Sequence, residues 1–374
     1  MMETLDTSAL PAMPAPFWFV QFFKVLGFIL HMVPMNLWFV GMVLAVLFYR
    51  RTGPARTWAE RLGTQMPVIV AFGVNLGIVP LLFIQVAYPW AFYPATILTA
   101  WFWFSIVLLL IFAYYGVYAF AFGMKRQAET MPAWRYAAGW IAAGLFLLMG
   151  LLFCNGFSLM ASPDHWQSLW LTHNVAGAAT GTAHNFADPS LWFRWLLMLG
   201  LAMLTTAAYT VVDAACFVKA DRKDYRLWAA GFAWRLGLVG AAVTAAAGAA
   251  YVWGTWDRDL FARMTSGSRL PLTALTAIAP VLPVLALTLF RNRTPDLIAA
   301  GLVGGAQVVV LTLNAVSRQV VQNLEIAAYG KVWEIPQKPD WGPMALFLVA
   351  FVLGAAVIGW MLAQVVRSAK ASVQ

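Results

Sequence analysis

Nine long apolar stretches constrain the fold of this chain more than any other feature of its sequence. Each contains about 20 or more residues, rich in Leu, Ala, Phe, Val and Gly, which is the length that a helix needs to cross a hydrocarbon core roughly 30 Å thick. A helix satisfies its own backbone hydrogen bonds in lipid. We therefore predict an all-α integral membrane protein with nine transmembrane helices, at approximately residues 17–49, 66–87, 95–123, 134–160, 189–217, 226–254, 270–290, 295–318 and 343–367.

Composition agrees with a single membrane domain. Hydrophobic residues make up 62% of the chain and charged residues 10%, against roughly 25% charged residues in a soluble globular domain. No long polar stretch interrupts the apolar ones, so residues 1–374 are expected to form one polytopic unit. Outside the helices we expect an N-terminal tail at 1–16, a loop at 161–188 and a loop at 319–342. The start "PD" and the apolar spacing of "PDHWQSLWLTH" predict an interfacial helix in the second segment.

The basic residues predict the orientation of the helices. The segments after predicted helices one, three, five and seven, together with the C-terminal tail, hold fifteen of the 24 lysines and arginines. Positive charge favours the cytoplasmic side of a membrane, so the N-terminus is expected outside and the C-terminus inside. The net charge of +9 is then mainly a topology signal, and no nucleic-acid partner is predicted.

Motifs exclude several classes of cofactor and protein. The chain has two cysteines, Cys154 and Cys216, and no C-x-x-C, C-x-x-C-H or H-E-x-x-H pattern. Covalently attached haem, iron–sulfur clusters and zinc sites of the usual spacing are therefore not expected. The sequence shows no internal repeat, which argues against a secondary transporter.

Ionisable residues within the predicted helices are few, and such residues usually have functional roles because they are costly in lipid. Asp213 and Arg235 are predicted to pair across helices five and six. The remaining group is Lys24, His31, Arg194 and Arg318, which the predicted topology places in the outer half of the membrane. With no acidic partner predicted nearby, the three cations suit an anion such as haem propionates, or the polar head of a quinone.

His31 has two interpretations. Neutral imidazole is a common ligand of haem iron, so His31 is the candidate ligand of one b-type haem. The alternative is a structural histidine that makes a hydrogen bond between helices.

Several landmarks resemble the large, haem-bearing subunit I of cytochrome bd quinol oxidases. "NLGIVPLLFIQVAYPWAFY" is similar to the exit of that family's second helix, Q-x-x-x-x-W-x-x-Y, and "DPSLWFRWLL" is similar to the start of its fifth. The family's first-helix histidine corresponds to His31, and Arg318 and Gln319 fall on its G-R-Q-P-W motif. The other matching residues are Gln85, Trp90, Tyr93, Asn155, Gly156 and Phe157. The resemblance implies a nine-helix bundle like that of subunit I, in the inner membrane of a bacterium.

The departures from this family concern its oxygen chemistry. The position of the fifth-helix haem ligand is occupied by Leu197, and that of the glutamate ligand by Ala315. The two glutamates of the proton route fall near Trp103 and Ile111. Leu and Ala offer no atom to iron, so the resemblance implies a relative that keeps the scaffold without reducing oxygen.

The resulting expectation is a membrane subunit of a respiratory electron-transfer complex. It would exchange electrons between quinol or quinone and an outer-face cytochrome, expected to carry several haems, alongside other membrane subunits. Its cofactor-binding residues would be His31, Lys24, Arg194, Arg318 and Gln319; no catalytic residue is assigned. The alternative is a haem-free anchor that assembles a redox partner.

Overall fold

The computed structural model describes residues 6–125 and 131–373, and within these it is almost entirely helical. Nine helical segments of this part of the chain are long and apolar enough to cross a membrane. The chain is therefore a multi-pass membrane protein. The segments are α1 with η2 and α2 (Phe17–Tyr49), α3 (Pro54–Ala87), α5 (Ala100–Lys125), α6 (Ala133–Ala161), α8 (Pro189–Cys216), α9 (Lys223–Thr255), η4 with α11 and α12 (Gly267–Phe290), α13 (Leu297–Ala327) and α14 (Trp341–Val373).

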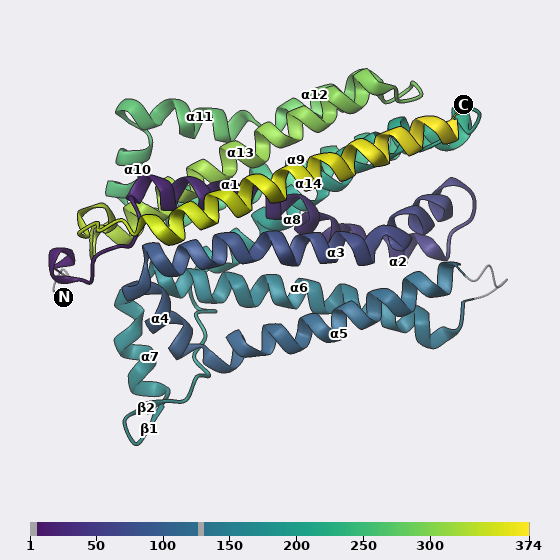
Figure 1. Ribbon diagram of the computed structural model, residues 1–374. Helices are drawn as coiled ribbons and strands as arrows, with labels where there is room; N and C mark the ends of the chain where they lie inside the picture. The colour runs from purple at the N-terminus through teal and green to yellow at the C-terminus, as the bar shows by residue number, and fades with distance from the viewer. Residues whose placement is uncertain (1–5, 126–130, 374) are drawn as a thin grey trace.

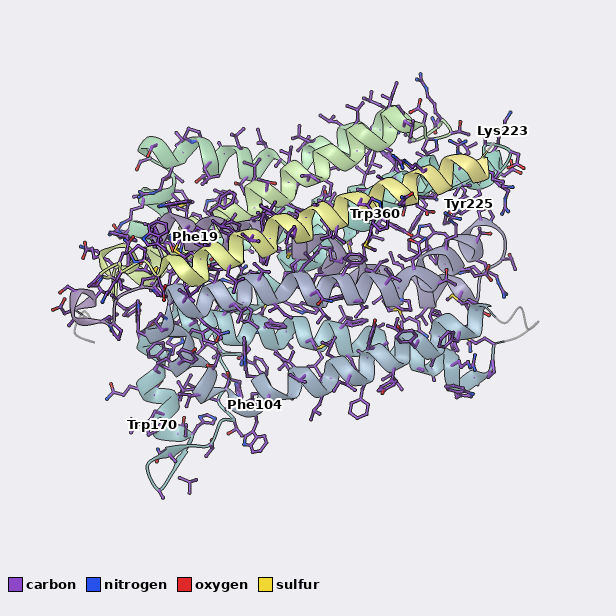
Figure 2. All side chains as sticks on the ribbon, in the orientation of Figure 1. Phe19, Phe104, Trp170, Lys223, Tyr225 and Trp360 are labelled. Atoms are coloured by element: carbon purple, nitrogen blue, oxygen red, sulfur yellow. The ribbon has the colours of Figure 1, made fainter. Side chains whose placement is uncertain are left out.

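Short elements cover one end of the bundle. One end, which we call the α7 end, carries η1 (Thr7–Ala9), α4 (Pro89–Leu98), η3 (Pro163–His165), α7 (Trp166–Thr172), the β1–β2 hairpin (Asn174–Val175 and Ala178–Ala179), α10 (Arg258–Met264) and η5 (Val332–Glu334). The opposite end, the α2 end, carries the turn between α2 and α3 (Figure 1). Trp170 and Lys223 mark these opposite ends in Figure 2. The basic turns around residues 50–53 and 291–296 share the α2 end with Lys223. The basic segments of the sequence thus gather at one end of the bundle. The predicted orientation would place this α2 end in the cytoplasm.

The first membrane segment is a broken helix. α1 (Phe17–Asn36) contains Pro34, and the next five residues, Leu37–Gly41, form the π-helix η2 before α2 (Met42–Tyr49) resumes. Proline has no N–H and its ring clashes with the carbonyl four residues earlier, so it disturbs the α-helical hydrogen bonds around it. The wider π turn occurs directly after this disturbance.

Glycines let α1 and α3 approach each other closely. A Cβ atom on Gly73 would lie 2.2 Å from the Trp38 ring, and one on Gly27 would lie 2.9 Å from Pro80. Gly77 faces His31 in the same way, at 2.8 Å. Gly73 and Gly77 form a G-x-x-x-G pair, the spacing that brings membrane helices into close contact. The two helices therefore pack with aromatic rings of one seated on bare backbone of the other.

Several predicted boundaries differ from the structure. Residues 95–98 belong to the separate helix α4 instead of the third membrane segment, which begins at Ala100. Helix α13 does not end at residue 318 but continues to Ala327, so the loop predicted at 319–342 is shorter. "QVVQNLEIAAYG" has no glycine or proline before Gly330, which leaves the helix no reason to stop at residue 318.

Candidate functional site

Three of the predicted site residues lie on helices that pack together near the α7 end. Lys24, Phe28 and His31 are spaced by four and three residues on α1, so they share one face of that helix. The guanidinium of Arg318, on α13, lies 4.4 Å from the centre of the Phe28 ring. Phe28 sits between Lys24 and His31 along α1, so Arg318 reaches this face between the other two. We call Lys24, His31 and Arg318 the α1–α13 site.

His31 forms a hydrogen bond between helices. Its Nδ1 lies 2.8 Å from the backbone oxygen of Gly73 on α3. A carbonyl oxygen only accepts, so Nδ1 must carry the proton and donate it. This fixes the tautomer and leaves Nε2 with its lone pair available. The ring is half-buried against Gly77, where any side chain would displace it.

Lys24 is held by polar side chains alone. Its Nζ donates to Gln322 Oε1 at 2.6 Å and lies 4.3 Å from the centre of the Tyr88 ring. The lysine is 7% exposed, and no carboxylate of the described residues lies within salt-bridge distance of it. The amine thus lies against an amide oxygen and an aromatic face, neither of which carries a negative charge.

Gln319 belongs to the same polar network. Its Nε2 donates to the hydroxyl of Tyr88 at 2.7 Å and to Asn323 Oδ1 at 3.0 Å. Tyr88 also contacts Asn323 Oδ1 and exchanges hydrogen bonds with Gln21. Gln319 therefore has two protein partners, Tyr88 and Asn323. The network connects α1, the α3–α4 junction and α13.

Arg318 is the least neutralised cation of the site. It is exposed, and its guanidinium is stacked against Phe28 and, at 5.7 Å, against the ring of Phe157 on α6. Within residues 6–125 and 131–373, no carboxylate lies within 4 Å of it. Nine residues separate Arg318 from the end of α13, a depth of about 14 Å along the helix. A cation at this depth is suited to an anionic group approaching between the helices.

Arg194 has an acidic partner, contrary to the prediction. Its Nη2 lies 2.7 Å from Glu325 Oε1, and the hydroxyl of Tyr251 bonds to both groups at 2.9 and 3.0 Å. Glu325 was missed because the helix was predicted to end before it. The pair neutralises Arg194, so within the described parts of the chain Lys24 and Arg318 are the basic residues of the predicted group without a carboxylate partner.

The predicted pair of Asp213 and Arg235 is also wrong. Asp213 is 2% exposed and accepts two hydrogen bonds of 2.7 Å from Arg61 on α3. A guanidinium and a carboxylate fit this two-bond geometry well. Sequence placed Arg61 before the second predicted helix, which in fact begins at Pro54 and carries Arg61 into the bundle. Arg235 is left exposed elsewhere on α9.

A buried polar cluster was missed because only ionisable groups were considered. The amide nitrogens of Asn36 and Gln307 both donate to Thr205 Oγ1, at 2.8 and 2.9 Å. Thr205 donates its own proton to Leu201 O at 2.9 Å. The hydroxyl can then only accept from the amides, which fixes their orientation. These three side chains link α1, α8 and α13 directly before the π-helix.

The landmarks of the resemblance have mixed surroundings. Asn155 Oδ1 accepts from the backbone N of Asn185 at 2.7 Å and so anchors the segment 161–188. Tyr93 donates to Gln85 at 3.3 Å. Leu197 and Ala315 leave no iron ligand at the two positions where the resemblance would require one.

The segment 161–188 contains the other three histidines. His165 bonds to Asn185 at 2.9 Å, and the rings of His173 and His184 lie 6.3 Å apart. Among the described residues no three His, Cys, Asp or Glu side chains are grouped to hold a metal ion. Tyr329 donates to Asp164 at 2.9 Å, and burial together with this bond raises the pKa of Tyr329 to about 12. This contact joins the segment to the chain that follows α13.

Comparison with known proteins gave no match, either to a protein-family model or to a curated protein sequence.

Proposed function

We propose that this chain is the membrane subunit of a respiratory electron-transfer complex that exchanges electrons between a quinone and a cytochrome docked at the α7 end. The observation that supports this most is Arg318. Its guanidinium belongs to a membrane helix, lies over two phenylalanine rings, and has no carboxylate of the described residues beside it. Such a group suits the polar head of a quinone or a haem propionate.

His31 is the residue that would hold the iron of one b-type haem. Its Nδ1–H donates to the Gly73 carbonyl, a hydrogen bond that fixes the ring and leaves Nε2 free to bind a metal. Arg318 would then hold a propionate, while Lys24 would set the positive potential around it. The haem, when bound, would supply a one-electron carrier between quinone and cytochrome.

Oxygen reduction is not part of the proposal. Leu197 and Ala315 have no atom that could bind haem iron at the two positions where the resembled family has ligands. Trp103 and Ile111, near the family's two proton-route glutamates, cannot carry protons. In the proposed reaction, a quinol loses two electrons and two protons, and the electrons reduce two haem irons of the cytochrome one at a time. The partner would dock on α7 and the neighbouring loops, in the inner membrane of a bacterium and beside other membrane subunits.

A second function has its own support. The His31–Gly73 bond and the Lys24–Gln322 bond satisfy these side chains within the protein. Both residues would then be structural, and the chain would be a haem-free anchor that positions a redox partner. An optical spectrum of the purified protein distinguishes the two functions, because only the first predicts b-type absorbance.

The decisive experiment supplies a reduced quinol analogue to the isolated complex and follows both cytochrome reduction and oxygen uptake. We expect cytochrome reduction without oxygen uptake, and at least a tenfold slower rate in Arg318→Ala. Arg293→Ala is the matched control, because Arg293 is an exposed arginine at the opposite, α2 end. Rapid oxygen uptake, or equal rates in Arg318→Ala and wild type, would contradict the proposal.

A further inference from the structure

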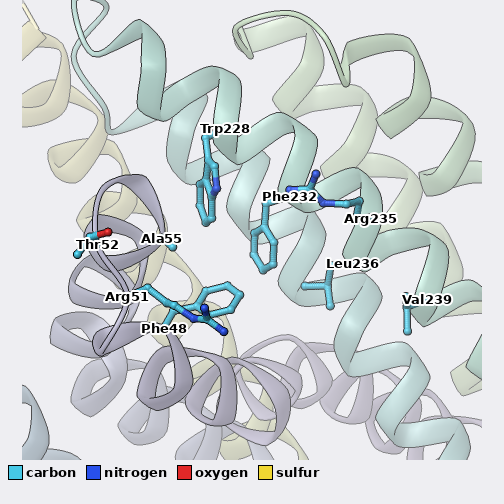
Figure 3. Close-up of a pocket in the computed structure, with 9 residues that line it drawn as sticks. All are labelled: Phe48, Arg51, Thr52, Ala55, Trp228, Phe232, Arg235, Leu236 and Val239. Carbon is cyan, nitrogen blue, oxygen red and sulfur yellow. The ribbon is translucent and has the colours of Figure 1, made fainter.

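A pocket at the α2 end is lined by two arginines, Arg51 and Arg235. It has a volume of about 520 Å³ and lies between the α2–α3 turn and α9 (Figure 3). Arg51 enters it from the turn and Arg235 from α9. Phe48, Trp228 and Phe232 provide aromatic walls. This volume is within the range of sites that bind small molecules.

Neither arginine has an acidic partner among the residues that the structure describes. Asp213, the one acidic residue inside α8, is engaged by Arg61, which is why Arg235 is available. In the part of the chain that the structure describes, no carboxylate lies within 4 Å of Arg51 or Arg235, and both side chains are exposed. Arg291, another arginine at this end, is instead stacked 4.8 Å from the Trp234 ring. The pocket therefore collects positive charge that nothing within these residues neutralises.

The position of the pocket along the membrane normal matches the headgroup region of a bilayer. Helix α9 has 33 residues and is about 50 Å long, roughly 20 Å more than the hydrocarbon core. If the excess is shared between its ends, Arg235 begins about 8 Å inside the hydrocarbon boundary, a distance that an arginine spans by extending toward the headgroups. Arg51, in the turn, lies at the headgroup level itself. The two arginines thus line one pocket from two different elements, both within reach of the level of the lipid phosphates.

We propose that this pocket binds the phosphate of an anionic phospholipid. Guanidinium groups bind phosphate oxygens through paired hydrogen bonds, and Thr52 adds a hydroxyl beside Arg51. The aromatic side chains and the outer part of α9 give an apolar wall for the glycerol and the first acyl carbons. Under the predicted orientation this end faces the cytoplasmic leaflet, where anionic lipids attract basic pockets between helices. The site is independent of the α1–α13 site at the other end of the bundle.

The experiment is native mass spectrometry of the full chain after delipidation and titration with phosphatidylglycerol or phosphatidylcholine. Wild type is expected to bind one phosphatidylglycerol at least tenfold more tightly than phosphatidylcholine. The double variant Arg51→Ala/Arg235→Ala should lose this preference. The matched control, Arg222→Ala/Arg293→Ala, removes two exposed arginines from the same end outside the pocket and should keep it.

Equal lipid preference in wild type and the Arg51/Arg235 double variant would overturn the site. A second arm adds inorganic phosphate to the lipid-bound protein. Retention of lipid at millimolar phosphate is the expected result. If millimolar phosphate displaced the lipid from wild type but not from the double variant, the ligand would be a soluble phosphate and the lipid assignment would be overturned. Circular dichroism of both double variants checks that the helices are intact.

Discussion

The guanidinium of Arg194 on α8 and the carboxylate of Glu325 on α13 lie 2.7 Å apart, with the hydroxyl of Tyr251 on α9 bonded to both. Three membrane helices therefore meet at one partly buried ion pair. It converts Arg194 from a residue available to a ligand into one that holds the bundle together. Arg318, two turns before Glu325 on α13, has no such partner among the described residues.

The Arg194–Glu325 pair is expected to stabilise the fold. Arg194→Ala or Glu325→Ala should each lower the free energy of unfolding by about 2 kcal/mol, because the remaining charge loses its partner in a site with little water. The double variant should cost less than the sum of the two. A double-mutant cycle in detergent measures this coupling. Arg263→Ala, which breaks an exposed pair with Asp259 at 2.8 Å, should cost under about 0.5 kcal/mol. A cycle with no coupling would contradict the assignment.

The partner of Asp213 can be identified by stability alone. Arg61→Ala and Asp213→Asn should each cost about 2 to 3 kcal/mol, because each breaks a two-bond pair around a buried carboxylate. Arg235→Ala should change the stability of delipidated protein by under about 0.5 kcal/mol. The measurement is thermal unfolding in detergent for the three variants side by side. If Arg235→Ala were as destabilising as Arg61→Ala, the pairing described here would be incorrect.

Gly77 tests the role of His31 without changing the histidine. A Cβ at residue 77 would lie 2.8 Å from the imidazole ring, so Gly77→Ala should displace His31. If His31 binds haem, both His31→Ala and Gly77→Ala should lose most of the b-type absorbance of the purified protein. Gly144→Ala is the control, since a Cβ there meets nothing within 4 Å. Full absorbance in His31→Ala would remove this histidine as a ligand.

The orientation can be tested with reporters. The α2 end carries the basic turns, so a fusion after Lys370 should be active only with a cytoplasmic reporter. A fusion in the α7–β1 segment, near residue 176, should be active only with an exported one. Both reporters are tried at both sites, which makes each fusion the control for the other. An exported signal after Lys370 would mean that the bundle is inverted.

The number of membrane segments followed from the sequence because length and hydropathy act locally. Nine stretches long enough to span a bilayer must become helices in lipid, whatever packs beside them. The structure contains these nine segments within its described residues. The sequence determined the ends of the helices less well. Pro34 disturbs its helix without ending it, and α13 continues past the last strongly apolar residues because nothing before Gly330 breaks it.

Sequence by itself therefore determined that the chain is helical, crosses the membrane repeatedly and carries most of its basic residues in every second connecting segment. Only the tertiary structure decided which charges meet. Asp213 could pair with Arg61 or Arg235, and Arg194 with a ligand or with Glu325; these choices depend on which helix faces are opposed, which hydropathy does not encode. Electrostatic energy falls with distance and depends strongly on burial, so each pairing was fixed by packing. Close contacts such as Gly73 with Trp38 set that packing.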